Sequence, residues 1–158
     1  MKTSAAYSDY DKGRVKEQAK DLPGAIALYG QAVHKAPEQA LLQNALGMAH
    51  LKNNSLADAK KYLTKAVQLD AEYFESHFGL GVLYLKENNP ALAKEHLQKS
   101  MKLMPTLGSA FFLAESYEKT GELAKAQTLY GQVAVADSRG NLGRAAAARY
   151  RALGGARR

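Results

Sequence analysis

The residues in this 158-residue sequence best suited to catalysis or metal binding are its histidines, His34, His50, His77 and His96. There is no cysteine, which excludes disulfides, thiolate metal ligands and a cysteine nucleophile. The sequence has no His-Glu-x-x-His zinc motif, no Ser–His–acid array and no phosphate-binding glycine loop. We therefore expect a protein that is not an enzyme and has no cofactor and no metal site.

The net charge of +7 is concentrated at the C-terminal end. The last twenty residues hold six arginines and no acid, whereas the rest of the chain holds 16 basic and 15 acidic residues. A nearly neutral body argues against nucleic acid as a partner. The arginine-rich end is interpreted as a solvated end, with contact to an acidic partner or to a membrane surface as the alternative.

The first residues lack the apolar core of a signal peptide, because Lys2 is followed by small and polar residues. No run approaches the roughly 18 apolar residues of a membrane span. We expect a soluble, cytoplasmic protein. A periplasmic or membrane-associated protein is the alternative, if a signal or an anchor has been removed.

An internal repeat of about 34 residues organises the chain. Alanines recur at intervals of 34, 34 and 33 residues. A large residue follows each of them by four positions and a smaller residue by seven, and a small residue stands twelve positions before each. Spacings of three and four place residues on one face of a helix, and small residues there let a second helix approach closely. The columns are Gly13, Gly47, Gly81 and Ala114; Ala25, Ala59, Ala93 and Ala126; Tyr29, Leu63, Leu97 and Tyr130; and Ala32, Ala66, Ser100 and Val133.

Turn signals divide each repeat into two antiparallel helices. Asp21, Ser55 and Asn89 recur at the same phase before the second helix, where an oxygen can accept a bond from a free helix N–H. Prolines follow the second helices of repeats one and three, at Pro37 and Pro105, where a helix should stop.

These columns resemble the tetratricopeptide repeat (TPR) family, whose pattern has leucine and glycine at positions 7 and 8, tyrosine at 11, alanine at 20 and 27, and proline at 32. Repeat three follows it most fully, with Leu80, Gly81, Tyr84, Ala93, Leu97, Ser100 and Pro105. Repeat one departs from it at Lys12 and Lys16, so we expect its first helix to be the least regular. The resemblance implies an all-α, right-handed superhelical solenoid of four helix pairs plus a C-terminal capping helix. We expect a single domain, residues 1–158, with repeats at 6–39, 40–73, 74–106 and 107–140 and a capping helix and basic tail at 141–158.

In the family, five positions of each first helix face a concave groove that binds partner proteins. Carried over, this surface is apolar at its centre, as interaction surfaces often are. The resemblance therefore implies a scaffold that binds a partner peptide or helix, and self-association remains an alternative. The residues expected to line the groove are Tyr10, Arg14, Leu41, Asn44, Met48, Leu51, Lys52, Glu75, Phe78, Val82, Leu85, Lys86, Phe111 and Glu115.

Other functions are weaker alternatives. The family subset that clamps the C-terminal carboxylate of chaperone tails needs basic and amide residues that neither register of this chain offers. A secretion-type chaperone for an unfolded or amphipathic client is a second interpretation. An RNA-binding helical repeat is a third, but the groove is apolar and the body nearly neutral. As to a metal pair, His50 and His77 fall about 10 Å apart along neighbouring parallel helices, at 1.5 Å per residue.

Overall fold

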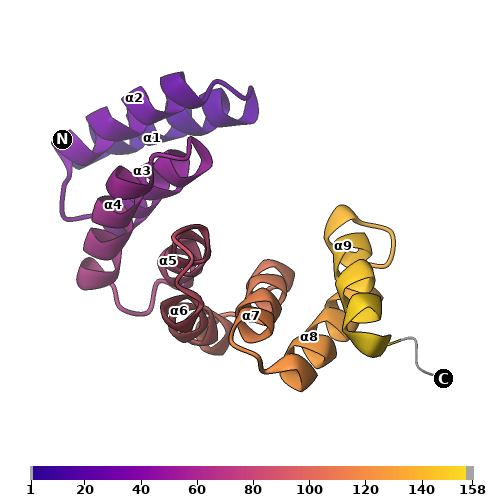
Figure 1. Ribbon diagram of the computed structural model, residues 1–158. Coiled ribbons are helices and arrows are strands. Elements are labelled where there is room, and N and C mark those ends of the chain that lie inside the picture. The colour runs from indigo at the N-terminus through magenta and orange to yellow at the C-terminus, as the bar shows by residue number, and fades with distance from the viewer. Residues whose placement is uncertain (1, 156–158) are drawn as a thin grey trace. The chain divides into compact units, whose positions relative to one another are not determined.

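The computed structural model describes residues 2–155, and within them it contains nine α-helices, a short π-helical turn and no strand (Figure 1). The all-α class and the succession of helix pairs predicted from the sequence are confirmed. The elements are α1 Lys2–Gln18, α2 Leu22–Lys35, α3 Ala40–Lys52, α4 Leu56–Leu69, α5 Phe74–Lys86, α6 Pro90–Leu103, α7 Leu107–Lys119, α8 Leu123–Ala136, α9 Asn141–Tyr150 and η1 Arg151–Gly155.

The chain forms two compact units that meet between Leu83 and Tyr84, inside α5. In the first unit α1 packs on α2, α3 packs on α4, and α3 also contacts α1 and α2. In the second unit α7 packs on α6 and α8, and α9 packs on α8 and α7. Each unit is therefore built by stacking a new helix on the preceding pair.

The repeat columns form the cores of both units. All four alanines of the column that begins at Ala25 are fully buried, and so are the large residues four positions later, from Tyr29 to Tyr130. A Cβ built on Gly47 would lie 2.8 Å from Cγ of Leu63 and 3.0 Å from its backbone nitrogen. The small residues of the first helices thus permit the close approach that the sequence predicted.

The predicted caps are present at two of three sites. The side chain of Asp21 accepts a bond from the backbone of Gly24, and that of Asn89 accepts one from Leu92. Ser55 occupies the cap position of α4 but caps no backbone N–H, because its hydroxyl instead accepts a bond from the amide of Asn53. The expectation for Ser55 was therefore only half right.

The first helix is more regular than expected. We anticipated an insecure element around Lys12 and Lys16, but α1 runs unbroken over 17 residues and both lysines are exposed to solvent. The buried face of α1 is made instead by small residues such as Ala6, which is fully buried, and Gly13, which packs against the ring of Tyr29. Lysines on the solvent-facing side of a terminal helix carry no burial cost.

Candidate partner-binding groove

A groove of about 340 Å³ opens on the first unit, over α1, α3 and the start of α5. The first helices of three consecutive repeats supply most of its surface, as the resemblance implied. Of the fourteen groove residues predicted from the sequence, the structure brings eight together here: Tyr10, Arg14, Leu41, Asn44, Met48, Lys52, Glu75 and Phe78.

Aromatic rings form one end of the groove. The ring of Tyr10 lies 5.8 Å from that of Tyr29 and 6.5 Å, edge-on, from that of Tyr7. Burial and, second, the negative charge of Glu75 raise the pKa of the Tyr73 phenol to about 12. Burial also raises the pKa of the Tyr10 and Tyr29 phenols. These three phenols stay neutral at physiological pH, so this end offers apolar ring faces and hydroxyl groups rather than charge.

The basic residues of the groove already have partners within the first unit. The Lys52 ammonium bonds to the Glu17 carboxylate, which also accepts a bond of 2.7 Å from the hydroxyl of Tyr29. Burial alone would raise the pKa of Glu17, but these two bonds outweigh it and hold the pKa below its usual value. The Arg14 guanidinium lies 5.8 Å from the centre of the Tyr10 ring, within cation–π range. Neither cation stands free in the groove.

Asn44 lines the groove but is largely occupied by the protein itself. Its side-chain oxygen accepts a buried bond of 3.1 Å from the hydroxyl of Ser76, and its residue is only 7% exposed. The side chain therefore ties α3 to α5 inside the first unit. Its exposed edge is small, and the apolar neighbours Leu41, Met48 and Phe78 contribute more accessible surface.

One further predicted residue, Leu51, is buried, with 4% exposure. Its column along the repeats explains this position. In repeats one and four the column holds Glu17 and Glu118, whose carboxylates accept bonds from the tyrosine of their own second helix, at 2.7 Å and 2.9 Å. Where the second helix has leucine instead, as at Leu63, the column also has leucine. In repeats one and four this column contacts the second helix of its own repeat, and Glu17 also lines the groove.

The other predicted residues lie outside this groove. Val82 is half-buried in the first unit, and the remaining four, Leu85, Lys86, Phe111 and Glu115, belong to the second unit. Phe111 is half-buried and its ring centre lies 5.5 Å from those of Phe112 and Tyr130, so it packs on the core of the second unit.

Four groove residues were not among those predicted: Glu17, Tyr29, Ala45 and Tyr73. Tyr29 belongs to the core column of the second helices, and only its hydroxyl reaches the groove, where it meets Glu17. Tyr73 lies in the loop before α5, and a pattern of helix positions gives no signal for it. The sequence does hold a signal for Glu17, because a glutamate stands twelve residues before Tyr29 and again before Tyr130.

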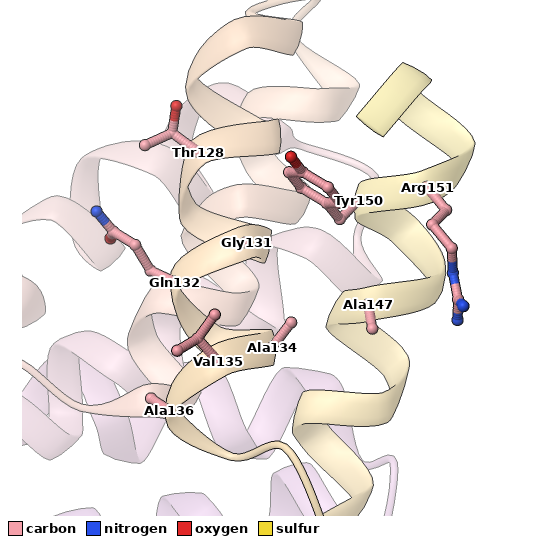
Figure 2. Close-up of a pocket in the computed structure, with 9 residues that line it drawn as sticks. All are labelled: Thr128, Gly131, Gln132, Ala134, Val135, Ala136, Ala147, Tyr150 and Arg151. Atoms are coloured by element: carbon pink, nitrogen blue, oxygen red, sulfur yellow. The ribbon is translucent and has the colours of Figure 1, made fainter. Parts of the chain in front are cut away.

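A second, larger hollow of about 830 Å³ lies on the second unit, between α8 and α9 (Figure 2). Its floor is made of small residues, including Gly131, Ala134 and Ala147, and Tyr150 stands between the two helices. Val135 at its edge is 82% exposed. None of the groove residues predicted from the sequence lies on this surface.

Within residues 2–155 no group of three or more histidine, aspartate or glutamate side chains could hold a metal ion. His50 stacks on Tyr62, with ring centres 5.5 Å apart, and His77 is buried with its Nε2 3.1 Å from the backbone oxygen of Ala71. Both imidazole rings therefore have contacts within the packed helices. In the same part of the chain no helix is long and apolar enough to cross a membrane.

Comparison with known proteins places the chain in a family. The model of the tetratricopeptide repeat family matches residues 10–73 and again residues 44–100, which together span more than half of the chain. The chain belongs to the tetratricopeptide repeat family. Members of this family mediate protein–protein interactions. Comparison with curated protein sequences gives no match.

Solved structures agree on the fold. The crystal structure of MamA protein is 21% identical, with a TM-score of 0.71 over 94% of this chain and 90% of that one. The Arabidopsis OM64 TPR domain is 16% identical, with a TM-score of 0.72 over 75% and 98%. The second TPR domain of human RPAP3, solved in complex with an HSP70 peptide, is 23% identical, with a TM-score of 0.68 over 73% and 98%.

Proposed function

We propose that this protein is a protein-interaction scaffold whose first unit binds an apolar peptide segment or helix of a partner in the groove over α1, α3 and α5. The observation that carries the proposal is the gathering of eight residues from three repeats around one groove, with Leu41, Met48 and Phe78 at its accessible surface. Burying such side chains stabilises a complex by roughly 1.5–3 kcal/mol each, before the costs of binding.

The groove is proposed to bind side chains rather than a chain-terminal carboxylate. Two neighbouring folds were solved with chaperone peptides, an HSP70 peptide on one RPAP3 domain and an HSP90 peptide on another. In this chain, however, Lys52 is neutralised by Glu17, and Arg14 lies over the ring of Tyr10. Glu75 adds a negative charge to the same groove. A terminal carboxylate would meet no unpaired cation there.

The test begins with peptides selected from a random phage-displayed library on the full chain. Their affinities are then measured by fluorescence anisotropy for the wild type and for Phe78→Ala. We expect at least tenfold weaker binding to the variant, equivalent to about 1.4 kcal/mol. Val15→Ala is the matched control, because Val15 is 64% exposed on α1 and does not line the groove.

Unchanged affinity of the selected peptides for Phe78→Ala, with the variant as helical as the wild type by circular dichroism, would show that the groove is not the binding surface. A second arm tests the chemistry of the ligand. A synthetic peptide that ends in Glu-Glu-Val-Asp should show no saturable binding. Tight binding of that peptide would contradict the proposal that the paired Lys52 and Arg14 leave no cation for a terminal carboxylate.

A further inference from the structure

The capping helix α9 lies where the first helix of a further pair would lie, and no second helix follows it within residues 2–155. It packs on α8 and α7 as α3 packs on α2 and α1. It is followed only by the five-residue turn η1 in the part of the chain that the structure describes. The surface of α9 that corresponds to the one a second helix covers in the other pairs is therefore uncovered by any helix that the structure describes.

The repeat phase locates that surface on α9. Two columns of the first helices continue into it at intervals of 34, 33 and 34 residues, and they end at Ala147 and Arg151. The earlier members of the first column are leucines with 2%, 2% and 5% exposure, and the core cluster of Leu46 includes Ala25 and Tyr29 of α2 as well as Tyr62 of α4. The columns are Leu46, Leu80, Leu113 and Ala147, and His50, Tyr84, Tyr117 and Arg151.

The second column meets the second helix of its own pair. The ring of His50 stacks on Tyr62 of α4 with centres 5.5 Å apart, and the ring of Tyr84 lies at the same distance from that of His96 on α6. In the fourth pair an ammonium from α8 lies 5.2 Å from the centre of the aromatic ring of this column. Arg151 therefore stands where a residue normally contacts a second helix.

The hollow between α8 and α9 coincides with this position. Both Ala147 and Arg151 line it, together with Gly131, Ala134 and Val135 of α8 (Figure 2). Small residues on both walls let a helix backbone approach, and alanine in place of the leucine of the other pairs leaves room for a large apolar side chain. Apart from Thr128, Gln132 and Arg151, the hollow is lined by small and apolar residues and Tyr150, without the convergent polar groups that orient a small molecule, so it is better suited to docking a helix.

Charge indicates the nature of the occupant. No carboxylate lines the hollow, and Arg151 forms no ion pair with any residue that the structure describes. The last twenty residues hold six arginines and no acid. We propose that the hollow docks an amphipathic helix of another protein, with a large apolar residue over Ala147 and acidic residues along the edge that faces Arg151. This site is separate from the groove of the first unit and extends the proposed function to a second partner surface.

A second copy of this chain fits the hollow less well than an acidic helix does. After Val135, the most exposed large apolar residue in the described chain is Val15 on α1. Its exposed charged neighbours Asp11, Lys12 and Lys16 carry a net positive charge, which would face the arginines of α9 and η1. Like charges brought together across an interface disfavour association.

The test uses two designed 18-residue helical peptides and the full chain. Both peptides carry leucines on one face, and the edge of that face carries glutamates in one peptide and lysines in the other. By fluorescence anisotropy, we expect the glutamate peptide to bind at least tenfold more tightly than the lysine peptide. Arg151→Glu should reverse this order, and Ala147→Leu, which fills the hollow, should weaken binding of the glutamate peptide at least tenfold.

Two matched measurements keep the result interpretable. Phe78→Ala should leave the affinity of the glutamate peptide unchanged, because that residue lines the other groove. Equal binding of the two peptides, or an order that Arg151→Glu does not alter, overturns the proposal. So does a concentration-dependent dimer, seen by light scattering, that Ala147→Leu abolishes, because the hollow would then bind a second copy. If the groove of the first unit proves not to bind peptides, the inference about the hollow is unaffected.

Discussion

Two glycines in helix interiors provide a direct test of how closely the paired helices approach. A Cβ on Gly47 of α3 would lie 2.8 Å from Cγ of Leu63 and 3.0 Å from its backbone nitrogen. A Cβ on Gly30 of α2 would meet no heavy atom within 4 Å. Both glycines lie well inside their helices, so replacing either by alanine brings the same gain in helix propensity.

The difference between the two substitutions therefore isolates the steric cost. Gly→Ala in a helix interior stabilises by about 1 kcal/mol. Gly30→Ala should raise the free energy of unfolding by about that amount. At Gly47 the gain is opposed by overpacking, which costs roughly 1–3 kcal/mol, and the clash with a backbone atom cannot be relieved by a rotamer change. We therefore expect the free energy of unfolding of Gly47→Ala to be about 1–3 kcal/mol lower than that of Gly30→Ala.

Urea unfolding followed by circular dichroism at 222 nm measures both variants against the wild type. Adding Leu63→Ala to Gly47→Ala should recover part of the steric cost, so that the double variant is more stable than the sum of the single effects predicts. If Gly47→Ala stabilises the protein as much as Gly30→Ala does, the small-residue column does not set the distance between the helices and the packing argument fails.

Two further predictions concern the polar contacts of the second unit. Tyr130→Phe removes a hydroxyl that donates a bond of 2.9 Å to Glu118 from a fully buried ring, and it should lower the free energy of unfolding by about 1.5 kcal/mol in a urea titration; an unchanged midpoint would contradict this. Hydrogen bonds from Lys125 and then Lys94 lower the pKa of Glu122 to about 2. Because the folded pKa is depressed, this stabilisation is complete above the ordinary value of about 4.5 and is lost as the pH falls toward 2. Carboxyl NMR titration should show the low pKa and its rise in Lys94→Met, and a titration near 4.5 in the wild type would refute the pairing.

The sequence predicted what depends on helix periodicity. Columns of small and large residues placed the two helices of each pair and their buried faces, because one side-chain position recurs at each turn of a stacked repeat. The same phase brought Tyr10, Met48 and Phe78 to one groove. The division into two compact units inside α5 was not foreseen, since no change in composition or pattern marks it.

The remaining differences come from side chains that reach beyond their own position. Asn44 was assigned to a partner, but its side-chain oxygen accepts a hydrogen bond from the buried Ser76 of α5. Leu51 was assigned to the groove but is 4% exposed, and the residues of its column in repeats one and four bond to a tyrosine of the second helix. Tyr73 enters the groove from a loop, where helix periodicity has no meaning.

Of the four methionines in the sequence, one lies in the groove, so its methyl group can report on binding there. Met48 lines the groove of the first unit, whereas Met101 and Met104 lie in the second unit, and Met104 is 48% exposed. In a chain labelled with ¹³C at the methionine methyl groups, titration with a library-selected peptide should shift the Met48 signal in a saturable way and leave those of Met101 and Met104 in place. A saturable shift at Met104 with none at Met48 would contradict the assignment of partner binding to the groove of the first unit.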